Sequence, residues 1–223
     1  MIVPSRGRPD NIAALLDAWR DITTGDSRLL VAVDDDDPEL ERYLKLDTAG
    51  CRMYVGPRLR LGGTLNTLAL KHSREHFAIG FMGDDHRPRG PVGWDVQFVT
   101  ELRRLGTGLV YGDDLLQRER LPTAVAMTSN IIRTLGYMVP PGLTHLYMDD
   151  FWLTLGRKLG SITYLSGVVI EHMHPVAGKA QMDAGYAEVN APEMYRKDGE
   201  TFERWKRESL IVEVARLKTL MVR

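Results

Sequence analysis

Short apolar segments alternate with amphipathic helical patterns along most of this chain. Residues 28–33 and 78–82 are typical of buried strands, whereas the apolar residues at positions 12, 15, 16 and 19 recur at helical spacing. Such alternation favours a mostly parallel central sheet with helices on both faces. We therefore expect an α/β fold that binds its ligands beyond the carboxyl ends of the strands.

Length and composition narrow the class of protein further. The 223 residues suffice for one large core, so we expect a single domain over residues 1–223. The 29 basic and 30 acidic side chains nearly cancel, which argues against nucleic acid as a partner. Cys51 is the only cysteine, so a bound metal would need carboxylate and imidazole ligands. We find no signal-peptide pattern and no apolar run of membrane-spanning length, so we expect a cytoplasmic protein.

Two of the expected strands end in acidic clusters. Asp34 and Asp35 follow the first, and Asp84, Asp85 and His86 follow the second. Because parallel strands end at one edge of a sheet, both clusters should border the same ligand site. Carboxylates with an imidazole suit Mn²⁺ or Mg²⁺, and a diphosphate would complete the coordination. The alternative for an isolated pair of acids is a solvated turn.

His172 and His174 are further candidate metal ligands. Residues two apart in an extended chain project from the same face, so both imidazoles could point at one site. Either could instead be a surface or core histidine bonded to the backbone. The sequence does not decide which of the two would join Asp84 and His86 on a metal.

The order of these motifs resembles the GT-A glycosyltransferases, particularly family 2 and the polypeptide N-acetylgalactosaminyltransferases. The resemblance covers nearly the whole chain and implies the GT-A fold, a Rossmann-like sheet with helices on both faces. Asp84-Asp85-His86 falls where the family's Asp-x-Asp motif belongs and ends in histidine, as in the Asp-x-His motif of the N-acetylgalactosaminyltransferases. Those enzymes also place a later histidine on the metal. The positions similar to nucleotide-sugar-binding positions of the family are Pro4, Ser5, Arg6, Asp34, Asp35, Gly63, Asn66, Asp84 and Asp85.

Asp149 and Asp150 resemble the Glu-Asp motif of family 2, with Asp in place of Glu at the first position. In inverting members this motif supplies the general base that removes the proton of the acceptor hydroxyl. The resemblance thus implies Asp150 as the base, with Asp149 beside it, and favours inversion only weakly. Two acids at a helix start are also stabilised by the helix dipole alone.

Residues 176–197 are rich in Gly, Ala and polar residues and show no clear period, so we expect a mobile loop. Lys179 in this segment could close over the diphosphate. A last helix is expected over residues 201–220. The compact pattern looks like that of enzymes encoded by bacteriophages, which would place the protein in the host cytoplasm. Four arginines could also contact phosphates: Arg6, Arg8, Arg58 and Arg60.

Together these patterns predict a metal-dependent glycosyltransferase. It would move a sugar from a nucleoside-diphosphate sugar, with UDP favoured, to an acceptor hydroxyl on a protein, glycan or lipid. Residues 1–90 would bind the donor, 91–200 would hold the acceptor and catalytic groups, and 201–223 would form a C-terminal helix. Two alternatives stay open: a nucleotidyltransferase acting on a sugar phosphate, which would release pyrophosphate, or a nucleotide-sugar-binding protein without turnover.

Overall fold

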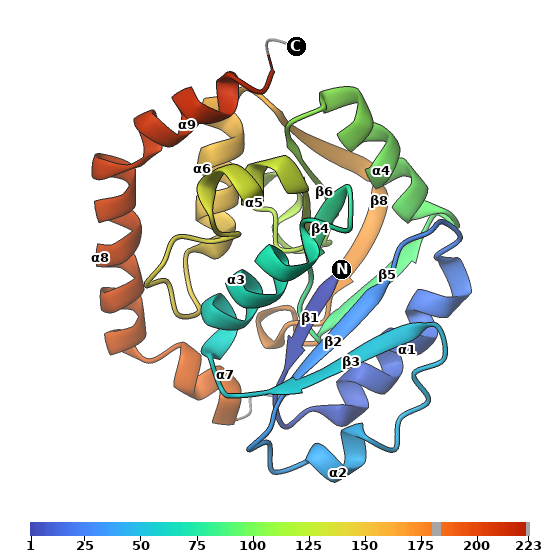
Figure 1. Cartoon of the computed structure of the whole chain (residues 1–223). Coiled ribbons are helices and arrows are strands. Elements are labelled where there is room, and N and C mark those ends of the chain that lie inside the picture. Colours follow the sequence, from blue (N-terminus) through green and yellow to red (C-terminus); the bar gives the residue numbers. More distant parts are fainter. Residues whose placement is uncertain (180–183, 222–223) are drawn as a thin grey trace.

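A computed structural model describes residues 1–179 and 184–221 of the chain. Its centre is an eight-stranded sheet in the order β3-β2-β1-β4-β7-β6-β8-β5 (Figure 1). Six strands point in one direction, whereas β5 and β7 run the opposite way. The predicted α/β fold with a mostly parallel sheet is therefore confirmed. The strands are β1 (Ile2–Ser5), β2 (Leu29–Asp34), β3 (Cys51–Gly56), β4 (Ala78–Phe81), β5 (His86–Gly90), β6 (Leu109–Asp113), β7 (Val125–Thr128) and β8 (Ile162–His172).

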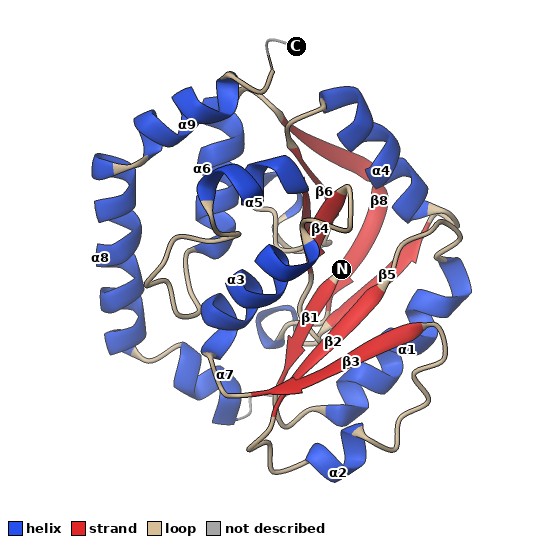
Figure 2. Ribbon diagram, viewed as in Figure 1, coloured by secondary structure: helices blue, strands red, loops and turns tan. Residues whose placement is uncertain are grey.

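Helices cover both faces of the sheet, as Figure 2 shows. An apolar cluster on one face joins the sheet to α3, α5, α6, α8 and α9, and a cluster on the other face joins it to α1 and α4. Successive strand residues alternate between the faces: Ile2 belongs to the first cluster and Val3 to the second. The helices are α1 (Pro9–Ile22), α2 (Leu40–Tyr43), α3 (Arg60–His72), α4 (Trp94–Leu105), α5 (Ser129–Leu135), α6 (Met148–Leu159), α7 (Ala184–Val189), α8 (Pro192–Glu208) and α9 (Leu210–Lys218), with 3₁₀ turns η1 (Arg118–Arg120) and η2 (Pro175–Ala177).

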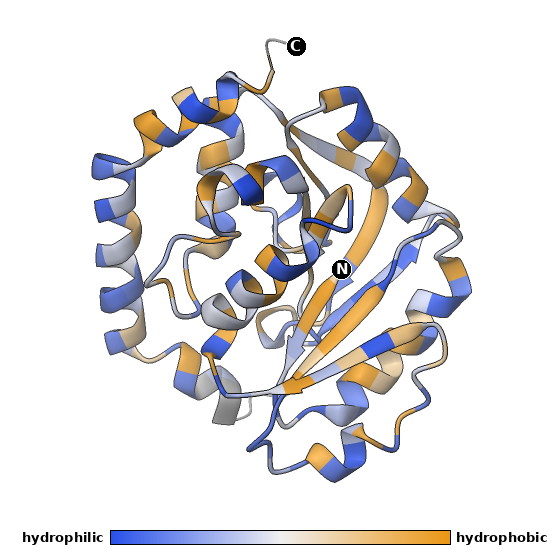
Figure 3. Ribbon diagram, in the orientation of Figure 1, coloured by the Kyte–Doolittle hydropathy of each residue, from blue (hydrophilic) through white to orange (hydrophobic). Residues whose placement is uncertain are grey.

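The prediction of a loop over residues 176–197 is wrong for the part that the structure describes. It contains η2 and α7, and α8 already begins at Pro192, while residues 180–183 lie outside the described part. Proline at the first helical position, with Glu193 in the first turn, is an ordinary helix start. No apolar period marks the start of α8, because Asp198 is its first buried residue, and Figure 3 shows how hydrophilic the helix is.

The C-terminal helix is also divided differently from the prediction. α8 ends at Glu208 and α9 starts at Leu210, so Ser209 separates two helices where one was expected from residue 201. Within the described residues, no helix combines the length and the apolar character needed to cross a membrane.

Strand β8 changes partner along its length. Its first half pairs in parallel with β6, and its second half pairs antiparallel with β5. His86 begins β5, a strand that the sequence analysis did not predict, and lies directly opposite His172 in this ladder. The turn from β4 into β5 therefore carries the Asp84-Asp85-His86 cluster to the end of β8.

Candidate functional site

A cavity of about 370 Å³ opens at the carboxyl ends of β1, β2 and β4, the edge of the sheet that the sequence indicated. The loops after these strands form part of its wall. The starts of α3 and α6, the end of β8 and residues of α7 also line it. Thirteen residues that the sequence analysis named line this cavity: Pro4, Ser5, Arg6, Arg8, Asp34, Arg58, Arg60, Asp84, Asp85, His86, Asp149, His172 and His174.

The remaining sequence-predicted residues lie outside the cavity lining; they are Asp35, Gly63, Asn66, Asp150 and Lys179. Asp35 is exposed beyond β2. The Asn66 side chain binds main chain instead, because its Oδ1 accepts from the N–H groups of Met138 (2.8 Å) and Val139 (3.0 Å). Lys179 pairs with Glu171 through an Nζ–Oε1 contact of 2.7 Å.

Asp85, His86 and His172 form a group that could hold a metal ion. Each offers one ligand atom, and these atoms lie within 4.8 Å of one another. The strand register explains the arrangement, since opposite positions of β5 and β8 stack the two imidazoles with centroids 4.2 Å apart. Asp85 Oδ1 lies 3.2 Å from His86 Nδ1, and its Oδ2 lies 3.3 Å from His172 Nε2.

Asp84 and His174 line the same cavity but lie outside this group of three. The Oδ2 atom of Asp84 accepts a hydrogen bond of 2.6 Å from Ser5, and its Oδ1 lies 3.5 Å from Arg8. The Nδ1 atom of His174 accepts from the backbone N–H of Val176 at 3.2 Å. Of the two histidines that the sequence left open, His172 is the one stacked on His86, and Asp85 rather than Asp84 contacts a nitrogen of each ring.

Asp114, which was not among the predicted site residues, lies behind His172. Its buried carboxylate accepts from Thr123 Oγ1 at 2.8 Å and lies 3.9 Å from His172 Nδ1. Although burial opposes protonation, the carboxylates of Asp114 and Asp85 raise the pKa of His172 to about 9. A carboxylate behind a metal-binding histidine commonly orients the ring. The sequence signal that could have identified Asp114 is its position next to Asp113, at the end of β6.

The electrostatics of the group suit a divalent cation. Burial and the charge of Asp85 raise the pKa of Asp84, whereas the neighbouring histidines hold the pKa of Asp85 well below its usual range despite its burial. Among the described residues, the buried Nδ1 of His172 has no hydrogen-bond partner. The carboxylate and the oxygens of a bound ligand are the donors that Mn²⁺ and Mg²⁺ prefer, and the two imidazoles would complete a mixed site. The residues present therefore fit the predicted metal.

Helix α7 contacts the metal-capable group through Tyr186. The Tyr186 hydroxyl donates to Oδ2 of Asp85 at 2.7 Å, and the Arg8 guanidinium lies 4.1 Å from the centre of its ring. Tyr186 is not predictable from the sequence, because nothing in its local pattern marks a contact with a residue 101 positions away.

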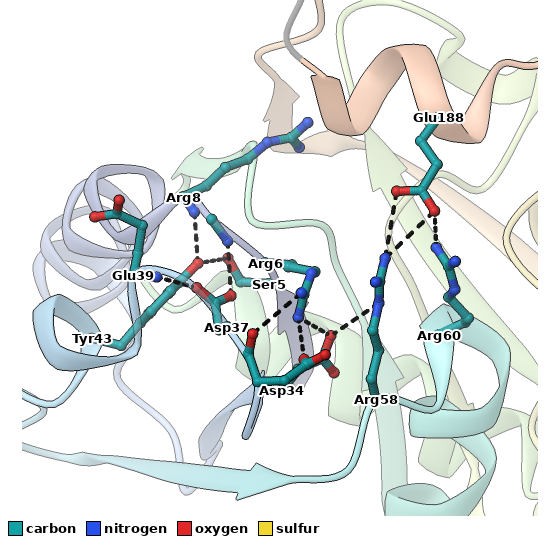
Figure 4. A network of polar contacts seen from close by, with 12 residues as sticks. Ser5, Arg6, Arg8, Asp34, Asp37, Glu39, Tyr43, Arg58, Arg60 and Glu188 are labelled. Carbon is teal, nitrogen blue, oxygen red and sulfur yellow. Dashed lines mark hydrogen bonds and ion pairs between the residues drawn. The ribbon is translucent and has the colours of Figure 1, made fainter.

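The opposite wall of the cavity is a network of charged side chains (Figure 4). Glu188 of α7 reaches across to Arg58 and Arg60, at 3.4 Å from the first. Arg6 contacts Asp34 at 3.0 Å, and Arg58 lies 3.8 Å from the same carboxylate. These arginines therefore already pair with carboxylates, and an anionic ligand would have to compete with Glu188.

A buried carboxylate on α8 supports the wall that leads into α6. Asp198 is fully buried and accepts three backbone hydrogen bonds, from Thr144 at 3.0 Å, His145 at 2.7 Å and Leu146 at 2.8 Å. This loop continues into Asp149 at the cavity. Asp198 is not predictable from the sequence, since an acid within a polar helix carries no sign of burial.

Sequence comparison places this chain in no family, since no family model and no curated protein matches it. Several solved structures resemble it in fold. A mannosyltransferase from Pyrobaculum calidifontis, in complex with GDP-mannose and Mn²⁺, has a TM-score of 0.59 at 12% identity, covering 98% of this chain and 72% of that one. Glucosyl-3-phosphoglycerate synthase from Mycobacterium tuberculosis, with Mn²⁺, UDP-glucose and glycerol 3-phosphate, has a TM-score of 0.56 at 15% identity, covering 92% and 78%.

A third similar structure is S. aureus TarS in complex with UDP-GlcNAc, with a TM-score of 0.52 at 13% identity, covering 93% of this chain and 72% of that one. At such low sequence identities, the structural similarity shows the fold alone. The chain therefore has the GT-A fold that the order of its motifs implied.

Proposed function

We propose that this protein is a metal-dependent glycosyltransferase that moves a sugar from a nucleoside-diphosphate sugar to an acceptor hydroxyl. The observation that carries the proposal is the position of Asp85, His86 and His172 in one cavity with Arg6 and Asp34, at the carboxyl edge of a GT-A sheet. Similar structures were solved with GDP-mannose and Mn²⁺, or with UDP-glucose and Mn²⁺, which supports the same ligand class here.

Each part of the cavity has a role in this proposal. Asp85, His86 and His172 would hold Mn²⁺ or Mg²⁺, which offsets the negative charge that develops on the leaving nucleoside diphosphate. Asp84, fixed by Ser5, offers an acceptor for a ribose hydroxyl. Residues 1–90 would thus bind most of the donor, and residues 91–200 would complete the metal site and receive the acceptor.

We place the general base at Asp149 rather than at Asp150. Asp149 lines the cavity, whereas Asp150 lies outside the lining. Burial, followed by the charge of Asp150, raises the pKa of Asp149 to about 6. A carboxylate with this pKa is ionised at neutral pH and is a stronger base than an ordinary aspartate. A carboxylate base supports an inverting reaction.

Asp149→Asn should leave donor binding intact and slow transfer by ~10²–10⁴-fold, because the amide cannot take the acceptor's proton. The wild-type rate should fall about tenfold per pH unit below pH 6, where Asp149 becomes protonated. Single-turnover kinetics between pH 5 and 8 measure both effects. Asp150→Asn is the matched control and should retain most activity. A near-normal rate for Asp149→Asn would show that another group is the general base.

A thermal-shift screen tests the function itself. The purified chain would be heated with Mn²⁺ and a panel of UDP-, GDP- and dTDP-sugars, since a ligand that binds the native state raises its apparent stability. A metal-dependent rise with one nucleotide class, followed by release of the nucleoside diphosphate on adding acceptor, supports the proposal. Binding without turnover indicates a binding protein, and pyrophosphate release from a nucleoside triphosphate indicates a nucleotidyltransferase.

Glu188→Gln should tighten the binding of an anionic ligand. The substitution removes the charge that pairs with Arg58 and Arg60, so that Arg60 loses this competing carboxylate and Arg58 keeps only its contact with Asp34. Exposed ion pairs contribute up to about 1 kcal/mol, so we expect at most about a fivefold gain in affinity. Calorimetry with UDP and Mn²⁺ measures it. Glu193→Gln, which removes an exposed ion pair on α8, should have no effect. Weaker binding by Glu188→Gln would show that Glu188 assists the ligand.

A further inference from the structure

A second group of candidate metal ligands lies at the opposite edge of the sheet. His72 is the last residue of α3, and Glu75 and His76 follow it in the turn before β4. Each offers one ligand atom, and these atoms lie within 4.8 Å of one another. The four residues of β4 span roughly 13 Å and separate this group from Asp85, so the two groups cannot share an ion.

Helical geometry brings the three side chains together. The backbone N–H groups of Glu75 and His76 both donate to the carbonyl of His72, each at 3.1 Å, so the helical turn continues as far as His76. Residues three and four apart share one face of a helix. His72 Nδ1 lies 3.6 Å from Glu75 Oε2, and the two imidazole centroids are 6.0 Å apart.

This turn is anchored on both sides of the group. Ser73 is buried, its Oγ donates to the carbonyl of Leu70 at 2.9 Å, and its own carbonyl accepts from Arg133. On the other side, the Arg103 guanidinium lies 4.9 Å from the centre of the Phe77 ring. The backbone that carries the ligands is thus already ordered, and little conformational entropy would oppose binding of an ion.

The local charges favour a cation with nitrogen ligands. The carboxyl end of a helix carries partial negative charge, and Glu75 adds a carboxylate. The imidazoles of His72 and His76 supply two nitrogen donors. The Arg52 guanidinium near His76 carries a positive charge that opposes a cation. The Glu75 carboxylate, 3.6 Å from His72 Nδ1, acts against that repulsion.

The three side chains also line a second cavity, of about 640 Å³, along the amino-terminal ends of β1, β2 and β4. An ion held by His72, Glu75 and His76 would face this space. Three protein ligands leave at least one coordination position of a tetrahedral ion for water or for a ligand from solution.

We propose that His72, Glu75 and His76 bind a divalent cation of the Zn²⁺ class. Two imidazoles and one carboxylate form a ligand set that zinc uses in proteins, whereas Mg²⁺ and Ca²⁺ prefer oxygen ligands. No diphosphate oxygens are needed here, in contrast to the group around Asp85. The site does not depend on glycosyl transfer.

Zinc content after equilibrium dialysis tests this site on the whole chain without nucleotide. His76→Gln should bind one equivalent of Zn²⁺ fewer than wild type, and Glu75→Gln should lose at least ~10-fold in affinity. The difference in equivalents is the readout, so Zn²⁺ bound at Asp85 contributes equally to both proteins. Lys71→Gln changes a neighbouring exposed residue and is the matched control, expected to behave as wild type.

Equal zinc content in His76→Gln and wild type would overturn the proposal. Zinc binding that is detectable only at millimolar concentration would also overturn it. His76 and Glu75 are both exposed, so neither substitution should disturb folding. Matching thermal unfolding curves without metal would confirm that a lost equivalent reflects a lost ligand.

Discussion

Asp85→Ala should abolish Mn²⁺-dependent binding of a nucleotide sugar and reduce transfer by ~10³-fold or more. Asp85 is 7% exposed and supplies the carboxylate between His86 and His172. Without it, two imidazoles remain, which is a poor site for Mn²⁺. Metal stabilisation of a developing charge is worth several kcal/mol, and each 1.36 kcal/mol is a factor of ten in rate. Calorimetry with and without Mn²⁺, together with the transfer rate, measures both losses.

Two further substitutions make this result specific. From the sequence alone, Asp84 was the expected ligand, so Asp84→Ala is the direct comparison. Because Asp84 contacts Ser5 and Arg8 instead, we expect its loss to weaken nucleotide binding while Mn²⁺ binding persists. Asp113→Ala, at the end of β6, should behave as wild type. If Asp85→Ala retained Mn²⁺ binding and Asp84→Ala lost it, Asp84, the ligand predicted from the motif, would be the metal ligand.

Asp198→Ala should lower the free energy of unfolding by about 3 kcal/mol or more. Three backbone N–H groups, those of residues 144–146, would lose an acceptor that is itself fully buried. Each unsatisfied group costs about 1–3 kcal/mol. In a chain of this size, 1 kcal/mol lowers the thermal midpoint by about 2–4 °C. Thermal and urea unfolding, followed by circular dichroism, measure the change.

A kinetic measurement distinguishes displacement of this loop from a general loss of stability. The loop leads into Asp149, so Asp198→Ala should also raise KM or lower kcat at temperatures where the variant is folded. Glu213→Gln is the control, because Glu213 is also buried and accepts from Tyr137 and from Trp205 at 2.9 Å, but supports no cavity wall. It should reduce stability with normal kinetics. Unchanged stability of Asp198→Ala would contradict the role assigned to these bonds.

Much of the sheet could be predicted because β1, β2, β4, β6 and β7 are largely buried. Continuous apolar runs such as residues 29–33 and 78–82 are uncommon outside such sheets. The same reasoning predicted the edge at which the cavity lies, because Asp34 and Asp84 stand at the ends of parallel strands and must meet at one edge. β5 was missed, since its sequence His-Arg-Pro-Arg-Gly lacks apolar alternation, and its pairing with β8 alone makes it a strand.

The sequence by itself determined the fold class, the edge of the sheet where the cavity opens, and the acids and histidines gathered there, because local periodicity and strand ends can be recognised in consecutive residues. The tertiary structure alone decided that Asp85 rather than Asp84 contacts both imidazoles, and that His172 rather than His174 lies beside His86. It also decided that Asp114 lies behind them. These choices depend on strand register and side-chain direction, and those arise from the pairing of β5 with β8, more than 80 residues apart. Local sequence carries no information about such contacts, since a shift of one residue in register would reverse every side chain.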